Sequence, residues 1–220
     1  MKFRAAIFDL DGTLIDSLND IADSMNHVLS KHGFPIHPAE DYRFFVGEGM
    51  RVLVTRALPE GFSDQKLIDQ CTDQMKNEYA LRWDRKTRIY EGILPLLTFL
   101  QSQGLILSVL SNKPHEFTVK IVENYFGCSV FKCIMGAGIF PSKPDPASAL
   151  NIAKSLGIKP SEVIYIGDSA VDMKTAKSAG MFACGCLWGF REREELVENG
   201  ADLVVENPEI LMRYLGFKEG

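Results

Sequence analysis

The chain has 220 residues, of which 46% are hydrophobic and 24% are charged, as is usual for a globular protein. The formal net charge is −5, so we expect no nucleic-acid partner, because nucleic-acid-binding domains carry a basic surface. No apolar run approaches the roughly 20 residues of a membrane helix, so we expect no membrane partner. Charges near the first residue argue against a secretory leader, and the 5 cysteines form no paired framework, so we predict a cytoplasmic protein.

Short apolar runs bounded by glycine or polar residues are typical of strands that are buried on both faces of a parallel sheet. They lie at residues 4–8, 105–110, 131–136, 162–167, 181–187 and 202–205. Helical patterns follow Asn112, Asp145 and Ser169. This alternation predicts an α/β fold class with a doubly wound, mainly parallel sheet, similar to a Rossmann fold.

The interval from residue 17 to residue 88 contains no strand-like run. Its apolar residues repeat at helical spacing within 18–29, 51–58 and 67–75. We therefore predict an all-helical domain of residues 17–88, inserted into a core domain of residues 1–16 and 89–220.

Two carboxylates stand at the end of the first predicted strand. Residues i and i+2 of a strand point to the same side, so Asp9 and Asp11 converge at the edge where open α/β sheets bind ligands. Two close carboxylates repel unless a cation lies between them or one of them holds a proton. A surface turn is the alternative, because Asp-Gly is a common turn pair, and this segment alone leaves both interpretations open.

Polar groups also follow the later strands. Ser111 offers a hydroxyl beside the backbone N–H groups of a predicted helix start, which suits an anion. Lys143 precedes Pro144, which favours an extended backbone and fixes the direction of the lysine. Asp168 and Asp172 are one helical turn apart. Each group alone has a structural explanation, such as a helix cap or a solvated lysine, but their coincidence at successive strand ends predicts a reaction site.

The segments "DLDGTL" and "GDSAVD", the junction at Ser111 and the residue Lys143 resemble the four motifs of the haloacid dehalogenase-like phosphohydrolases. They occur in the order of that family and cover essentially the whole chain. The inserted helical domain is similar to the cap domain of the family. Within this domain, "FVGEGMRVLVTRAL" (45–58) is similar to a pattern of the phosphoglycolate phosphatases.

The resemblance implies a Mg²⁺-dependent enzyme that works through an aspartyl-phosphate. Asp9 would be the nucleophile, and Asp11 would act first as general acid and then as general base. The implied Mg²⁺ ligands are Asp9, Asp168 and the backbone carbonyl of Asp11, with Asp172 behind them. A metal on Asp9, with the side chain of Asp11 free of it, would separate the pKa values of the two carboxyl groups.

The resemblance also implies how the phosphoryl group is held. Ser111 and Lys143 would bind it together with the backbone N–H groups of Gly12 and Asn112. In the cap, Arg51 is expected to reach a carboxylate of the substrate, with an exposed helix cation as the alternative. Glu48 is expected near the ligand, although its charge would repel an acidic substrate.

A small phosphorylated metabolite is therefore the expected partner, with phosphoglycolate as the best single substrate. A β-phosphoglucomutase-like phosphotransferase and a pyrophosphatase are the alternatives within the family. Dehalogenation is disfavoured, because it needs no general acid at the position of Asp11. An interaction protein on a retained fold is disfavoured by the intact motifs, and the chain is expected to be a monomer or a homodimer.

Overall fold

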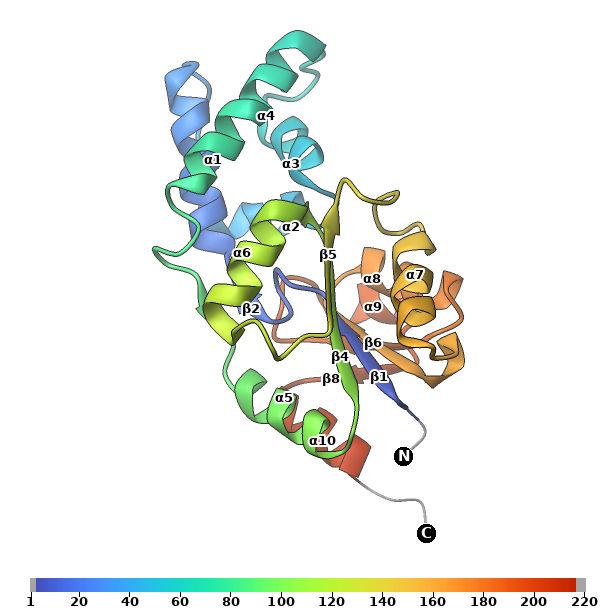
Figure 1. Ribbon diagram of the computed structural model, residues 1–220. Coiled ribbons are helices and arrows are strands. Elements are labelled where there is room, and N and C mark those ends of the chain that lie inside the picture. The colour runs from blue at the N-terminus through green and yellow to red at the C-terminus, as the bar shows by residue number, and fades with distance from the viewer. Residues whose placement is uncertain (1–2, 217–220) are drawn as a thin grey trace.

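The computed structural model describes residues 3–216. Its centre is a six-stranded sheet with the strand order β5–β4–β1–β6–β7–β8 (Figure 1). All neighbouring strands of this sheet pair in parallel. The six predicted strands are confirmed as β1 (Ala5–Phe8), β4 (Ile106–Pro114), β5 (Cys133–Ala137), β6 (Val163–Gly167), β7 (Phe182–Cys186) and β8 (Leu203–Val205).

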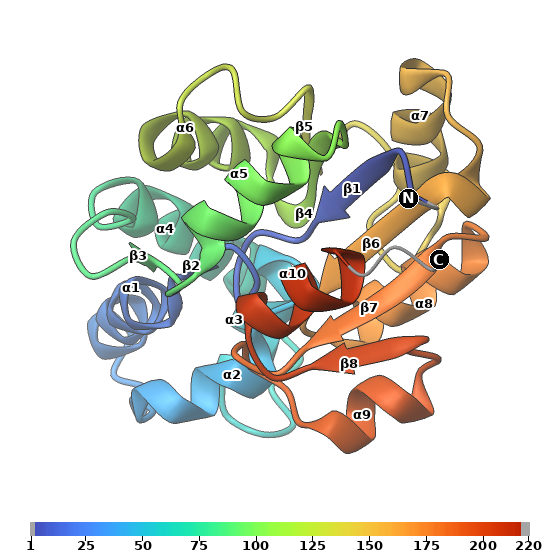
Figure 2. The same ribbon diagram turned by 90° about the horizontal axis from the view of Figure 1, so that it is seen from below.

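Helices cover both faces of the sheet. One face carries α5 (Ile93–Ser102), α6 (His115–Phe126) and α10 (Pro208–Gly216). The other face carries α7 (Ala147–Leu156), α8 (Ala170–Ser178) and α9 (Arg193–Glu198), and a short 3₁₀ turn, Pro160–Glu162, precedes β6. Figure 2 shows α5 and α10 side by side against the first face.

The central strand shows why the run of apolar residues is continuous. Ala6 and Phe8 pack into the hydrophobic core of one face, and Ala5 and Ile7 pack into the core of the other. All four side chains are fully buried. A strand that is buried on both faces has no solvent-facing side, so its sequence does not alternate between apolar and polar residues. The predicted doubly wound α/β fold class is confirmed.

The cap, residues 17–88, stands over the carboxyl ends of the strands (Figure 1). It contains α1 (Leu18–Lys31), a 3₁₀ turn (Ala39–Asp41), α2 (Tyr42–Phe45), α3 (Met50–Ala57) and α4 (Gln65–Ala80). Two short strands that were not predicted, β2 (Ile15–Asp16) and β3 (Arg88–Ile89), pair antiparallel at its base, and β3 begins at the last residue of the predicted insertion. The helical content of the insertion is confirmed, and the division into two domains at these boundaries stays a prediction.

Strand β4 extends further than its apolar run. It continues to Pro114, which pairs with Ala137 after a shift in register, and α6 begins only at His115. The residue before a proline prefers an extended backbone, which favours this continuation of the strand. The prediction that Ser111 lies beside the N–H groups of a helix start is therefore wrong, because Ser111 lies within the strand.

Candidate functional site

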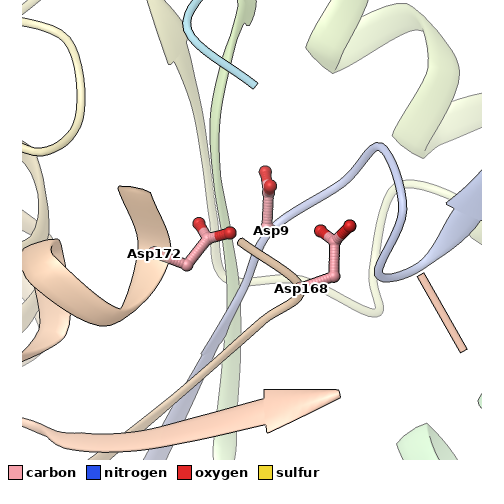
Figure 3. A group of neighbouring side chains, drawn as sticks. All are labelled: Asp9, Asp168 and Asp172. Atoms are coloured by element: carbon pink, nitrogen blue, oxygen red, sulfur yellow. The ribbon is translucent and has the colours of Figure 1, made fainter. Parts of the chain in front are cut away.

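Three carboxylates meet at the carboxyl edge of the sheet. Asp9 follows β1, Asp168 follows β6, and Asp172 lies in the first turn of α8. One oxygen atom of each lies within 4.8 Å of the others, and all three residues are buried. Figure 3 shows Asp172 reaching from its helix toward the end of β1, where Asp9 and Asp168 lie side by side. The sheet thus brings together Asp9 and Asp168, which are 159 residues apart in the chain.

A single buried lysine pairs with this acidic cluster. Lys143 Nζ lies 2.9 Å from Asp9 Oδ1 and 2.7 Å from Asp172 Oδ1. The same ammonium donates to the backbone carbonyl of Leu110 at 3.3 Å. Within residues 3–216, Lys143 is the one cation that forms a salt bridge with the cluster. One positive charge cannot balance three buried carboxylates, so a divalent cation held by oxygen atoms would fit here.

The pKa values of the cluster also indicate a shortage of positive charge. Burial raises the pKa of Asp9, and the charge of Asp172 raises it further, while Lys143 opposes only part of this. Burial and the charge of Asp172 raise the pKa of Asp168 to about 7. Burial alone would lower the pKa of Lys143, but Asp172 and Asp9 outweigh it and raise the pKa. The lysine is therefore held charged, and the carboxylates remain short of positive charge.

Neighbouring donors fix the direction of two of the carboxylates. Asp168 accepts hydrogen bonds from the hydroxyl of Thr13 at 3.1 Å and from the backbone N–H of Phe190 at 2.8 Å. Asp172 Oδ2 accepts from the hydroxyl of Ser169 at 2.6 Å and from its N–H at 3.2 Å, which closes a capping box on α8. Asp172 therefore combines a structural role at the helix start with a charged contact in the site.

Gly12 lies in the turn between β1 and β2, with a φ of +85°. A Cβ atom at this position would overlap the carboxylate of Asp168, so only glycine allows the turn to pass so close. Its backbone N–H donates to the carbonyl of Ile15 at 2.9 Å. The turn thus already uses this N–H, and the prediction that it binds a phosphoryl group stays a prediction.

The carboxylate of Asp11 lies apart from the acidic cluster. Lys113 Nζ contacts both of its oxygen atoms, at 2.6 and 2.8 Å, and the hydroxyl of Ser17 also donates to it. Lys113 was not among the predicted site residues. The signal was present, because Ser111 and Lys113 are separated by two positions on a strand, the same spacing that places Asp9 and Asp11 together.

The predicted residues Asn112 and Lys143 do come together. Asn112 Oδ1 accepts from the backbone N–H of Lys143 at 2.8 Å, and its Nδ2 donates to the Lys143 carbonyl at 3.0 Å. The same Nδ2 donates to the carbonyl of Gly47 in the cap at 3.0 Å. Ser111 Oγ accepts from the N–H of Lys113 at 3.2 Å and keeps its own hydrogen as a donor. Asn112 therefore links the lysine segment to the cap.

A pocket of about 510 Å³, including its opening to solvent, lies between the cap and the strand ends. The core contributes both motif carboxylates and the end of β4, and the cap contributes mainly apolar side chains. The lining residues are Asp9, Asp11, Ile21, Val46, Gly47, Gly49, Met50, Leu53, Met75, Tyr79, Asn112, Lys113 and Pro114. Asp9 and Asp11 thus face a space that can hold a small ligand.

Two predicted substrate-binding residues are not brought to this pocket. The carboxylate of Glu48 pairs with the guanidinium of Arg56, and Arg51 pairs with Asp69 at 2.9 Å. Neither Glu48 nor Arg51 lines the pocket. Each charge is balanced by a neighbour on the outside of the cap, so the structure does not support a substrate contact at either residue.

Residues 6–186 match the family described as haloacid dehalogenase-like hydrolase. The chain belongs to this family. The phosphoglycolate phosphatase of Pseudomonas putida is 32% identical over 214 residues, which are 95% of this chain and 78% of that protein. The phosphoglycolate phosphatase of Psychrobacter arcticus is 32% identical over 222 residues, covering 98% of this chain and 96% of its own. A crystal structure of a candidate phosphoglycolate phosphatase from Lactobacillus delbrueckii subsp. bulgaricus matches with a TM-score of 0.92 at 32% identity, covering 98% and 99% of the two chains.

These similarities confirm that the chain is an enzyme of the haloacid dehalogenase-like family and of its phosphoglycolate phosphatase-like branch. This branch consists of phosphoric monoester hydrolases, so the predicted enzyme class is confirmed as well. Within residues 3–216, no helix has both the length and the apolar character needed to cross a bilayer.

Proposed function

We propose that the protein is a Mg²⁺-dependent phosphatase of small phosphate monoesters that works through an aspartyl-phosphate, with phosphoglycolate as its best single substrate. The observation that carries this proposal is the position of Asp9, which lies against Lys143 and two further carboxylates and also lines a pocket. The names of the relatives support phosphoglycolate. The cytoplasmic location and the choice between a monomer and a homodimer stay predictions.

Residues of the acidic cluster fit Mg²⁺, because this ion prefers oxygen ligands and the cluster lacks positive charge. Asp9 and Asp168 would hold it directly together with the backbone carbonyl of Asp11. Asp172 would support them from behind, since Lys143 and Ser169 already occupy its oxygen atoms. When bound, the ion would reduce the repulsion between the phosphate dianion and the carboxylate that attacks it.

The chemistry divides into two steps that use different carboxylates. Asp9 attacks phosphorus and forms an aspartyl-phosphate, while the ester oxygen leaves and takes a proton from Asp11. Asp11 then takes a proton from water, which attacks phosphorus, releases inorganic phosphate and restores Asp9. Asp9 Oδ1 accepts from the N–H of Leu10 at 2.7 Å and from Lys143, so Oδ2 is the better placed nucleophilic atom. Ser111 and Lys143 would hold the phosphoryl oxygens, with the N–H of Asn112 beside them.

A phosphate-release screen tests the proposed function. We expect phosphoglycolate to give the highest kcat/KM in a panel with glucose phosphates, pyrophosphate and p-nitrophenyl phosphate, and we expect EDTA to remove the activity. Each compound is measured with and without Mg²⁺. Interconversion of glucose phosphates with little free phosphate would instead favour a mutase, and a preference for pyrophosphate would favour a pyrophosphatase.

The affinity for Mg²⁺ should depend on pH, because the ion needs ionised carboxylates and the pKa of Asp168 is raised to about 7. Binding therefore displaces a proton at pH 6 but not at pH 8, and we expect roughly tenfold tighter binding at pH 8. Without metal, the folded state keeps this proton over a range in which the unfolded state has released it, so stability falls as pH rises from about 4 to 7. Calorimetry and thermal melts at both pH values measure these effects, and an affinity that is the same at pH 6 and pH 8 would contradict the assignment of Asp168.

A further inference from the structure

The pocket is also lined by two polar side chains that the proposed chemistry does not use. They are Lys113, at the end of β4, and Tyr79, in the last turns of α4. Among the described residues that line the pocket, Lys113 is the only cation. The subsite formed by Lys113 and Tyr79 is therefore the part of the pocket that suits an anionic group.

Tyr79 presents an unused donor. The residue is 1% exposed, and its hydroxyl hydrogen has no acceptor within residues 3–216, although the ammonium of Lys113 lies close enough to interact with the hydroxyl oxygen. Burial raises the pKa of this phenol, with Lys113 opposing only part of the effect, so the hydroxyl keeps its proton. Buried hydroxyls are rarely left without a partner, and one that lines a pocket is placed to bind a ligand.

Lys113 also has capacity left for a ligand. A lysine ammonium has three N–H donors, and two of them serve the two oxygen atoms of Asp11. The ammonium lies over the face of the Tyr79 ring, 4.6 Å from its centroid. Burial works against its charge, but Asp11 and Tyr79 outweigh this and raise the pKa of Lys113, so it remains a cation.

We propose that Lys113 and Tyr79 bind the carboxylate of a substrate whose phosphoryl group lies at Asp9. This inference rests on the proposed function and adds the residues that select for a substrate with a carboxylate at the end away from the phosphoryl group. Asp11 already shares the charge of Lys113, so an incoming carboxylate needs the neutral hydroxyl of Tyr79 as a second donor.

The remaining wall of the pocket argues against sugar phosphates. Ile21, Met50, Leu53 and Met75 line it with apolar groups. The hydroxyls of a hexose would lose their hydrogen bonds to water on this wall without gaining partners. A substrate with one short apolar carbon segment between its two anionic ends avoids this loss.

A pair of non-hydrolysable ligands tests the subsite without relying on turnover. 3-Phosphonopropionate carries a carboxylate, and propylphosphonate has the same chain length without it. We expect calorimetry with the Mg²⁺-loaded protein to show at least about tenfold tighter binding of 3-phosphonopropionate. Tyr79→Phe should weaken 3-phosphonopropionate about tenfold and propylphosphonate less than about twofold, and Lys113→Met should weaken the former by about tenfold to a hundredfold.

Tyr79→Phe is the decisive variant, because it leaves Lys113 and Asp11 in place and removes only a hydroxyl whose hydrogen has no acceptor within residues 3–216. Matched controls are Tyr214→Phe, at an exposed tyrosine, and Lys76→Met, whose ammonium pairs with Glu116 on the surface. Equal binding of both ligands to the wild type, or a preference that survives in both pocket variants, overturns the subsite. Hydrolysis of p-nitrophenyl phosphate by the wild type is measured in parallel. If this hydrolysis is absent while the preference for 3-phosphonopropionate remains, the proposed function is overturned and the subsite is not.

Discussion

Asp9→Asn should reduce the hydrolysis of p-nitrophenyl phosphate and of phosphoglycolate by a factor on the order of 10⁴ or more, because an amide cannot form the aspartyl-phosphate. The loss should appear in kcat with both substrates, because Asp9 acts at the phosphoryl group that they share. It should also appear when p-nitrophenol is released, since a good leaving group still needs a nucleophile. Steady-state kinetics with saturating Mg²⁺ measure it, and near wild-type turnover would refute the nucleophile assignment.

The stability of Asp9→Asn separates a chemical effect from a folding defect. The raised pKa of Asp9 means that its charged form is disfavoured in the folded protein, chiefly through burial and then through Asp172. Removing that charge should therefore leave the melting temperature of the metal-free protein unchanged or higher at pH 7. Asp69→Asn is the matched control, because Asp69 pairs with Arg51 on the outside of the cap, and this variant should keep full activity.

Lys143→Met should be the most destabilising of the substitutions considered for the site. It removes the one ammonium that pairs with Asp9 and Asp172, both of which are buried, and methionine supplies no charge in its place. Loss of one partner from a buried ion pair costs about 3–5 kcal/mol of unfolding free energy. Urea denaturation of the metal-free protein measures the loss, and activity should vanish with it.

The effect of Lys143→Met should also depend on pH. Without the lysine, nothing opposes the rise in the pKa of Asp9 that burial and Asp172 cause, and Asp9 becomes neutral by binding a proton, so the deficit in stability should be smaller at pH 5 than at pH 8. Lys177→Met provides the comparison, because Lys177 pairs with Asp202 at 2.7 Å at an exposed position, and its loss should cost at most about 1 kcal/mol. If the two lysine variants were equally stable, the buried pair would not have the predicted importance.

Much of the fold could be read from the sequence because the strands are buried on both faces. Ala5 to Phe8 pack alternately into two cores, so the run is apolar throughout and stands out from the helical patterns. The site carboxylates could be predicted from the sequence for a related reason. Asp9 and Asp168 directly follow such runs, and parallel strands bring their carboxyl ends to a common edge.

The parts that could not be predicted depend on contacts between distant segments. Arg51 and Glu48 have plausible charges for a ligand, but their partners in the folded cap, Asp69 and Arg56, neutralise them outside the pocket. No local pattern distinguishes Tyr79 from any other apolar-face residue of a helix. Its place in the pocket follows only from the way the cap packs over β4.

One missed hydrogen bond and one wrong strand end have local causes that the sequence pattern does not reveal. The N–H of Gly12 looks free because glycine opens a turn, but the tight return to Ile15 uses it. Strand β4 was ended too early because its polar residues, from Ser111 onward, interrupt the apolar run although the backbone stays extended as far as Pro114. Polar residues after an apolar run therefore indicate a site, but they do not show at which residue the strand ends.

The pairing of β2 with β3 has a consequence for the evolution of substrate choice. Ile15 lies opposite Ile89, and Asp16 lies opposite Arg88, so the chain leaves the sheet and returns to it at neighbouring points. Everything between those points can lengthen, shorten or be exchanged without moving the strands that carry the acidic cluster. A family with this arrangement can keep one chemistry and acquire new substrates by replacing the single segment between β2 and β3. Chimaeras in which this segment is exchanged between two relatives would test that route.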